Sequence, residues 1–551
     1  MRNQAIRSFA ALTLAAVLTL PAWGQFDGPA PLAWRWSQPT SVSPSGSPTV
    51  ENGVTFVGVG GRIYALEVDS GNQVWRYPVG APLEGNFRSA VVLYENLAIA
   101  AADNSTIYAV DKNTGEARWQ HLSQSAILGQ PVLVGPYLVF LRSDNTLMAI
   151  NANDGTDAWP EPVRYQQGMY RNLASHGNNV LFFTTDGAIK ALNIGTRKEA
   201  WSTSLQSVSP DARITVLGET VYVNSGYFLI ALNAVSGRGR WQTQFDTVLA
   251  YGPAAGAEGI SVVDRDGRAY FTDLNGRRRT FASGNPAEGQ RRTQRNYVEL
   301  GSLPNNSPAV IGTKFAYPTT SGAIILVDPS TGVILWNYVI PPQNRAAAAA
   351  TSAPAGGPMG GPGGGPGLGS TGGTTSSTQP QVVYPPAAGD PVLAGSTLLV
   401  LARDGSLLAF DRELGVDRTA PKVEMVWPRP GAQISGRPPL DFVFDILDDA
   451  SGLNLNTLTI SIDDKPMEYR IGRDNRAIVS ISNVGANRPL SDGRKTVKVR
   501  VADWMGNIAE AEYTIVIDNS LPVIRPDANR PGGAGGGPGL GGGGGLGGGG
   551  N

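Results

Sequence analysis

A short motif that returns every 40 to 44 residues constrains the fold of this 551-residue chain more than any other feature. One copy runs from Ala109-Val110-Asp111 through Gly115 to Trp119, with the aromatic residue ten positions after the first. The Asp or Asn side chain caps a tight turn, and the glycine takes the positive φ angle that the turn requires. The period equals the length of four short strands with their turns, so the chain is predicted to be an array of small antiparallel sheets. The full copies end on Trp75, Trp119, Trp159, Trp201, Trp241 and Trp336.

Two degenerate copies extend the array. Phe271-Thr272-Asp273 leads to Phe281, and Ala409-Phe410-Asp411 reaches Thr419 where a tryptophan is expected. Eight copies of a four-stranded unit predict an all-β, eight-bladed β-propeller, and seven blades remain the alternative if one degenerate copy is excluded.

The missing eighth tryptophan has a candidate replacement near the start of the chain, in Trp34 or Trp36. Trp36 precedes Trp75 by 39 residues, which is about one period. We therefore expect the N-terminal strand to complete the eighth blade and to close the ring, so that no sheet edge stays unpaired.

At these motifs the chain resembles the PQQ-like repeat family, whose pattern is Asp/Asn-x-x-Thr-Gly followed by a docking tryptophan. The resemblance covers roughly residues 31–418 and implies a propeller fold. The family contains quinoprotein alcohol dehydrogenases and a non-enzymatic outer-membrane assembly propeller, so the fold alone leaves the function open. The expected blade-docking residues are Trp36, Trp75, Trp119, Trp159, Trp201, Trp241 and Trp336.

Composition divides the chain into four parts. Arg2 and Arg7 precede an apolar stretch and the triplet Ala22-Trp23-Gly24, which is typical of a signal peptide cleaved before Gln25. Long Gly/Pro/Ala-rich stretches lack the apolar residues needed for a core and are expected to be disordered. The predicted parts are residues 1–24, signal peptide; 25–418, propeller, with a disordered insertion at 346–386; 419–519, a β-sandwich; and 527–551, a disordered tail.

The predicted sandwich resembles the bacterial Ig-like repeats of surface proteins, through Thr419-Ala420-Pro421, Asp448–Leu453 and Asp503–Asn507. Its strands alternate polar and apolar residues, as a sheet with one wet face requires. Within it, Asp445, Asp448 and Asp449 are candidate calcium ligands. EF-hand spacing is absent, which favours turn capping for these carboxylates.

The sequence offers little material for catalysis. There is no cysteine and there are only two histidines, His121 and His176, so a Ser-His-Asp triad or a multi-histidine metal site is not expected. A quinoprotein dehydrogenase of this family would hold its quinone under a vicinal disulfide, and that pair cannot form here. We therefore expect no catalytic residues, no bound metal and no cofactor, and a PQQ-dependent dehydrogenase is the least favoured function.

Charge gives one candidate binding surface. The net charge of −1 gives no reason to expect nucleic acid as a partner, and no segment after the signal peptide is apolar enough to span a membrane. A local arginine cluster indicates a possible patch for an anion or a protein partner. The patch consists of Arg277, Arg278, Arg279, Arg291, Arg292 and Arg295.

These observations favour a secreted, periplasmic or cell-surface scaffold that binds another protein of the cell envelope, with envelope assembly as one version. The alternative from another class is a surface adhesin or glycan-binding module. The sequence does not identify the partner, the rim of the propeller that binds it, or the oligomeric state.

Overall fold

The computed structural model describes residues 26–210, 212–283, 293–343, 384–472 and 476–523. These residues form strands, turns and loops only, and they include no helix that is long and apolar enough to cross a membrane. The predicted signal peptide, the Gly-rich tail, Arg291, Arg292 and the insertion up to residue 383 lie outside the described residues. The predicted insertion extends three residues too far, because Tyr384 is buried against Gly322 and Pro386 accepts a hydrogen bond from Arg403.

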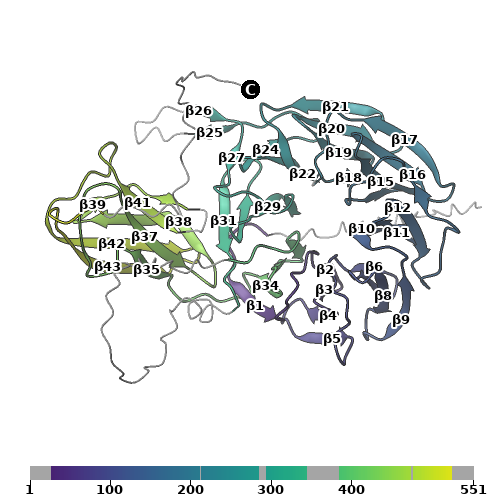
Figure 1. Cartoon of the computed structure of the whole chain (residues 1–551), viewed down its shortest axis with the longest axis horizontal. Helices are drawn as coiled ribbons and strands as arrows, with labels where there is room; N and C mark the ends of the chain where they lie inside the picture. Colours follow the sequence, from purple (N-terminus) through teal and green to yellow (C-terminus); the bar gives the residue numbers. More distant parts are fainter. Residues whose placement is uncertain (1–25, 211, 284–292, 344–383, 473–475, 524–551) are drawn as a thin grey trace, which may run out of the picture.

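Eight four-stranded antiparallel sheets form a ring in the described part of residues 32–410 (Figure 1). In seven of these sheets the strand that comes first in the chain lies on the inner side of the ring and the last one on the outer side (Figure 1). In the eighth sheet the inner strand is β32 (Val392–Ala394) and the outer strand is β1 (Leu32–Ser37), from the start of the chain. The number of these sheets equals the number of motif copies in the sequence. In chain order the first five sheets are β2 (Thr49–Glu51), β3 (Val54–Val59), β4 (Arg62–Glu67), β5 (Gln73–Tyr77); β6 (Val92–Tyr94), β7 (Leu97–Ala101), β8 (Thr106–Asp111), β9 (Ala117–Leu122); β10 (Ile127–Val134), β11 (Tyr137–Arg142), β12 (Thr146–Asn151), β13 (Val163–Arg164); β14 (Ala174–His176), β15 (Asn179–Thr184), β16 (Ala188–Asn193), β17 (Lys198–Ser204); and β18 (Thr215–Leu217), β19 (Thr220–Ser225), β20 (Phe228–Asn233), β21 (Gly239–Gln244).

Among the last three sheets, the sixth and the eighth depart from a simple four-strand repeat. A separate hairpin is inserted before the outer strand of the sixth sheet, and the eighth sheet takes its outer strand from the start of the chain. These sheets are β22 (Leu249–Gly256), β23 (Gly259–Asp264), β24 (Arg268–Thr272), β27 (Val298–Glu299), with the hairpin β25 (Phe281–Ser283) and β26 (Thr293–Arg295); β28 (Ala309–Ile311), β29 (Lys314–Pro318), β30 (Ala323–Val327), β31 (Ile334–Val339); and β32 (Val392–Ala394), β33 (Thr397–Leu401), β34 (Ser406–Phe410), β1 (Leu32–Ser37).

Ring closure depends on the pairing of β1 with β34. The two strands are antiparallel, with Trp34 opposite Ala409 and Trp36 opposite Leu407. Residues almost 375 positions apart therefore share one sheet, and the outer edge of β34 is covered.

The middle strands carry the core of the ring because both faces of each sheet pack against a neighbouring sheet. All five residues of β7 are buried, as are five of the six in β11. One continuous apolar cluster joins Leu97, Leu138 and Val180 of three successive sheets. This two-sided burial explains why the middle strands read as apolar runs, whereas the outer strands alternate.

The C-terminal part is a β-sandwich of two sheets with one shared core. Apolar residues alternate along β42, where Val497, Val499 and Val501 are buried beside Phe442 and Ile515. The sandwich prediction agrees with these two sheets, while the resemblance to bacterial Ig-like repeats stays a prediction. One sheet has the order β35 (Lys422–Trp427), β37 (Leu440–Leu447), β41 (Ala477–Ile481), β40 (Arg470–Ile471), and the other β36 (Gln433–Ile434), β43 (Ile508–Ile517), β42 (Gly493–Asp503), β38 (Leu453–Ile462), β39 (Lys465–Pro466).

Candidate functional site

A repeated tryptophan contact joins neighbouring sheets of the ring. The ring of Trp75 lies on Gly115 in the turn of the next sheet, and its indole N–H donates to the carbonyl of Lys112 at 2.9 Å. A Cβ at Gly115 would lie 2.7 Å from this ring, so the docking requires a glycine. The same indole bond, 2.9 to 3.1 Å long, joins Trp159 to Ile194, Trp201 to Ala234, and Trp241 to Leu274.

The position over the turn glycine of the next sheet, here called the docking slot, is also filled by Trp119 and Phe281, but without the indole hydrogen bond. The ring of Trp119 lies on Gly155, but its indole N–H is buried and has no acceptor among the described residues. Phe281 fills the slot over Gly332 and has no N–H to donate.

The first slot is taken by Trp34, which corrects the expectation for Trp36. Trp34 lies on Gly71 and donates to the carbonyl of Val68 at 2.8 Å. Trp36 instead meets the ring of Tyr64 edge-on, at a centroid distance of 4.7 Å. The reason is register, because Trp34 pairs with Ala409 just as Trp75 pairs with Ala65.

Trp336 departs from the pattern as well. It is fully buried and packs edge-on against Phe410 of the eighth sheet, at a centroid distance of 4.9 Å. Its indole N–H, however, donates to the carbonyl of Ser451 in the sandwich at 2.8 Å. The glycine of the last turn, Gly415, faces Pro31 instead of a tryptophan. Trp336, one of the expected blade-docking residues, therefore also joins the ring to the sandwich.

Three more hydrogen bonds join the sandwich to the ring. The hydroxyl of Tyr338 donates to the carbonyl of Asp449 at 2.8 Å, and the backbone N–H of Leu32 donates to Ala450 at 2.8 Å. The indole of Trp504 donates to the carbonyl of Asn337 at 3.3 Å. The sandwich is thus fixed to the seventh and eighth sheets by main-chain carbonyls on both sides.

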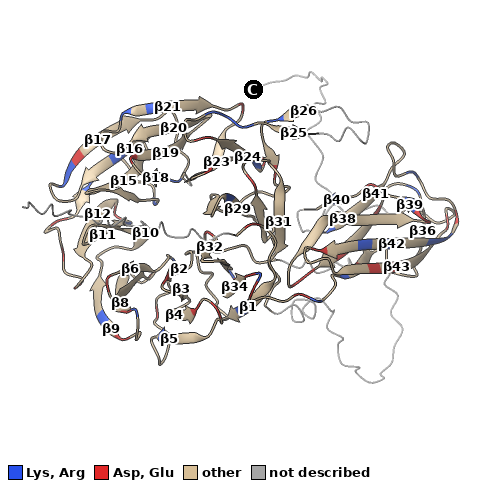
Figure 2. Cartoon of the chain, turned by 180° about the vertical axis from the view of Figure 1, so that it is seen from behind, with Lys and Arg blue, Asp and Glu red and all other residues tan. Residues whose placement is uncertain are grey.

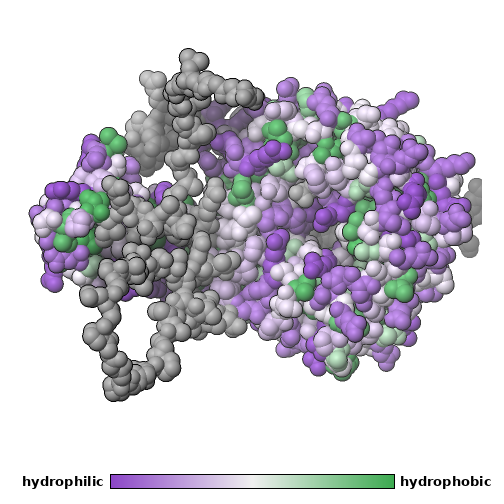
Figure 3. All heavy atoms as spheres, viewed as in Figure 1, coloured by the Kyte–Doolittle hydropathy of each residue, from purple (hydrophilic) through white to green (hydrophobic). Residues whose placement is uncertain are grey.

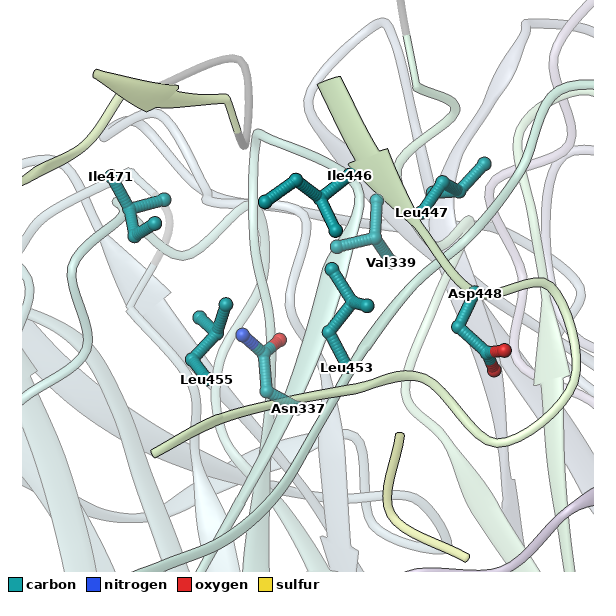
Figure 4. Close-up of a pocket in the computed structure, with 8 residues that line it drawn as sticks. All are labelled: Asn337, Val339, Ile446, Leu447, Asp448, Leu453, Leu455 and Ile471. Carbon is teal, nitrogen blue, oxygen red and sulfur yellow. The ribbon is translucent and has the colours of Figure 1, made fainter. Parts of the chain in front are cut away.

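A small apolar pocket lies beside these bonds. Val339 of β31 faces Ile446 and Leu453 of the sandwich, and Asp448 lies at the edge with its carboxylate turned away (Figure 4). The apolar contact adds burial to the interdomain hydrogen bonds.

Carboxylates from three segments meet at this junction. One oxygen each from Asp417, Asp448 and Asp503 lies within 4.8 Å of the others. The sequence had suggested Asp445, Asp448 and Asp449, of which only Asp448 belongs to the group. Its Oδ1 accepts the backbone N–H groups of residues 450, 451 and 452, which is the capping role expected for it.

The other two sequence candidates point elsewhere. Asp445 accepts the hydroxyl of Tyr384 at 3.3 Å, and Asp449 uses its backbone carbonyl for Tyr338. Asp503 was visible in the sequence only as the start of a turn, whose N–H groups at 505 and 507 bind its Oδ1. The local sequence therefore identifies each turn, but it does not show that the carboxylates of these turns lie close together in the fold.

The predicted arginine patch is partly used for internal contacts. Arg278 pairs with Asp246 at 3.2 Å and lies over the ring of Phe245, while Arg279 donates to the carbonyl of Pro329. Arg277 and Arg295 are exposed. Elsewhere basic and acidic residues are mixed around the ring (Figure 2). An anion or partner patch at these two exposed arginines stays a prediction.

An ion pair that the sequence did not reveal crosses between connections on the inner side of the ring. Arg213, before β18, binds Asp390, before β32, at 2.7 Å. Asn306 also donates to Asp390 at 3.0 Å, and the backbone N–H of Asp390 donates to Ser47 at 2.8 Å. Desolvation raises the pKa of Asp390 although Arg213 opposes the shift. These bonds connect the segments that precede the first strands of four sheets, β2, β18, β28 and β32.

The face of the ring that Figure 3 shows is mostly polar, with small apolar areas scattered over it. Among the described residues of the ring, the most exposed large apolar side chains are Val79 and Leu122, at 76% and 72% exposure. Single exposed residues of this kind are normal on a soluble surface and do not by themselves define a site.

Comparison with known proteins places this geometry in a family. A family model described as outer membrane protein assembly factor BamB matches residues 31–183 and 185–359, more than half of the chain. The BamB of Burkholderia pseudomallei (strain K96243) is 27% identical over 217 residues, which are 36% of this chain and 55% of that protein. The BamB of Moranella endobia (strain PCIT) is 23% identical over 256 residues, 42% of this chain and 62% of the relative.

The chain thus spans less than two thirds of the length of these curated relatives. The crystal structure of BamB from Moraxella catarrhalis aligns with a TM-score of 0.48 and 14% identity, over 69% of this chain and 99% of that one. The family model covers the first seven sheets and the closing strand β1. On the strength of that match, this chain belongs to the family of outer membrane protein assembly factor BamB.

Proposed function

We propose that the protein is a non-enzymatic scaffold of the cell envelope that takes part in outer-membrane protein assembly. The observation that carries the proposal is the family match across residues 31–359. The curated relatives that the chain resembles are assembly factors by name. A location in the periplasm or at the envelope follows from the same relationship.

The structure supports a scaffold by the way it uses its polar groups. The half-buried ion pair of Arg213 and Asp390 is joined by Asn306, and most of the indole N–H groups donate to backbone carbonyls. Such bonds fix the ring and leave its loops to present a constant surface to a partner. The chain also lacks the cysteines with which a quinone enzyme of this fold would cover its cofactor.

The docked sandwich suggests a second presenting surface. It is held to the ring by at least four hydrogen bonds, so a partner would meet both parts in a fixed relation. We propose that the sandwich orients the ring or extends its contact area.

A gene deletion tests the proposed function directly. We expect the deletion to lower the amount of folded outer-membrane proteins, measured by their heat-modifiable mobility on gels, and the intact gene to restore it. Two complementing variants test whether the exposed arginines contact the partner. One is the double variant Arg277→Glu with Arg295→Glu, and its control is Arg494→Glu on the sandwich.

Unchanged outer-membrane proteins in the deletion strain would overturn the proposal. If the purified protein then bound defined sugars on a glycan array, the adhesin or glycan-binding alternative would replace it.

A further inference from the structure

Three acidic side chains from separate segments converge where the ring meets the sandwich. Asp417 lies in the connection after the last sheet of the ring, Asp448 follows β37, and Asp503 ends β42. One carboxylate oxygen of each lies within 4.8 Å of the other two. Asp448 and Asp503 are brought close by the fold of the sandwich, in which Leu453 pairs with Asp503. Asp417 reaches them from the connection that leads from the ring into β35, where its carbonyl accepts a hydrogen bond from Asn507.

The group has no compensating positive charge. Asp448 and Asp503 are only 4% and 1% exposed, and no Lys, Arg or His of the described residues forms an ion pair with any of the three. Buried carboxylates are stable in proteins when they are paired or bind a metal ion.

Two buried oxygens beside the group also lack a partner. Oδ1 of Asp417 accepts the N–H and hydroxyl of Thr419, but its Oδ2 is fully buried and has no donor among the residues that the structure describes. The hydroxyl of Ser451, a residue with 0% exposure, is likewise unpartnered, while its N–H lies 2.7 Å from Oδ1 of Asp448. Each buried polar atom without a partner calls for an explanation, and an ordered water or an ion is a standard one.

The donor atoms indicate which ion would fit. All are oxygens, and neither histidine nor cysteine is present in the group, which disfavours zinc and copper. The three oxygens lie within 4.8 Å of one another, a separation that either Ca²⁺ or Mg²⁺ can bridge. Mg²⁺ requires a near-ideal octahedron, whereas Ca²⁺ accepts the irregular geometry of carboxylates from three separate loops, so the set suits Ca²⁺ better.

We propose that Asp417, Asp448 and Asp503 form a calcium site that locks the sandwich onto the ring. The loops that carry Asp448 and Asp503 also provide Ser451 and Trp504, which bond to the seventh sheet. A bound ion would tie both loops to the segment that leaves the ring. This inference is independent of the proposed role in assembly.

Terbium luminescence tests the site on the full-length protein. Tb³⁺ replaces Ca²⁺, and Trp504, next to Asp503, is placed to sensitise its emission. We expect a saturable signal that Ca²⁺ displaces and Mg²⁺ displaces poorly. Asp417→Asn should weaken Ca²⁺ binding at least tenfold, whereas Asp464→Asn, an exposed carboxylate paired with Lys498 in the same sandwich, should not change it.

A melting experiment separates a metal site from a purely structural cluster. In EDTA, Asp417→Asn should melt at or above the wild-type temperature because it removes one of three like charges. With Ca²⁺ the wild type should gain several degrees, and the variant should not. No displaceable terbium signal, equal Ca²⁺ affinity in Asp417→Asn, or a lower melting temperature of that variant in EDTA would each overturn the proposal.

Discussion

Replacement of Trp336 tests whether the seventh tryptophan joins the two domains. The side chain is fully buried among Phe26, Tyr338 and Phe410, and its indole bond to Ser451 is 2.8 Å long. Truncation of a buried Trp to Ala costs about 3–5 kcal/mol. Trp336→Phe keeps most of the apolar contact and leaves the carbonyl of Ser451 without its donor, at a cost of about 1–3 kcal/mol.

The assay combines denaturation with hydrogen exchange. In both variants we expect faster exchange in the loop 448–452 and faster proteolysis of the connection at residues 416–421, because the sandwich is less firmly docked. The matched control is Trp201→Phe, since Trp201 makes an equivalent bond to Ala234 inside the ring. The control should lose a similar amount of stability without changing exchange in the loop.

The reasoning fails if Trp336→Phe exchanges and is cleaved like the wild type. It also fails if Trp201→Phe loosens the sandwich loop as much as Trp336→Phe does, because the effect would then be a general loss of ring stability.

Three further predictions concern the ring. Deletion of residues 25–38 removes β1 and the docking Trp34, so the protein should melt well below the full chain and aggregate through the exposed edge of β34. Gly115→Ala places a Cβ 2.7 Å from the ring of Trp75 at a φ of +73°, and should lower the free energy of unfolding by about 1–3 kcal/mol. Arg118 and the N–H of Asn113 hold the pKa of Asp111 below its usual value, so its stabilising effect is complete above about pH 4 and is lost as the pH falls through the lowered pKa. The melting difference between wild type and Asp111→Asn should therefore shrink below about pH 4.

Each of these three has a control and a contrary outcome. Deletion of the tail after Pro526 should leave the melting temperature unchanged, and an N-terminal truncation that melts like the full chain would refute the closing role of β1. Gly135→Ala, at a positive φ but with no atom near its Cβ, should cost less than Gly115→Ala. A constant difference between wild type and Asp111→Asn down to pH 2 would show that the carboxylate charge does not stabilise the turn.

The sequence was sufficient for the features that depend on short segments. The capped turn of Asp111 and Gly115 and the period between tryptophans are local, because an Asx turn and a positive φ restrict only a few neighbouring residues. Repetition of this local unit also predicted the number of sheets and the closing strand. The alternation of polar and apolar residues along β42 likewise predicts a sandwich from one strand alone.

Only the tertiary structure decided the features that depend on distant segments. The choice of Trp34 over Trp36 rests on a register set by pairing with β34, far away in the chain. The indole N–H of Trp336 donates to Ser451 of the sandwich because Pro31 occupies the turn at Gly415 on which a docking tryptophan would lie. The repeat pattern does not reveal this contact of Pro31. The meeting of Asp417, Asp448 and Asp503 likewise depends on strand pairing within the sandwich and on the path of the connection that enters it. Periodicity records which residues face a neighbour, but the identity of that neighbour is fixed only when segments far apart in the chain pack together.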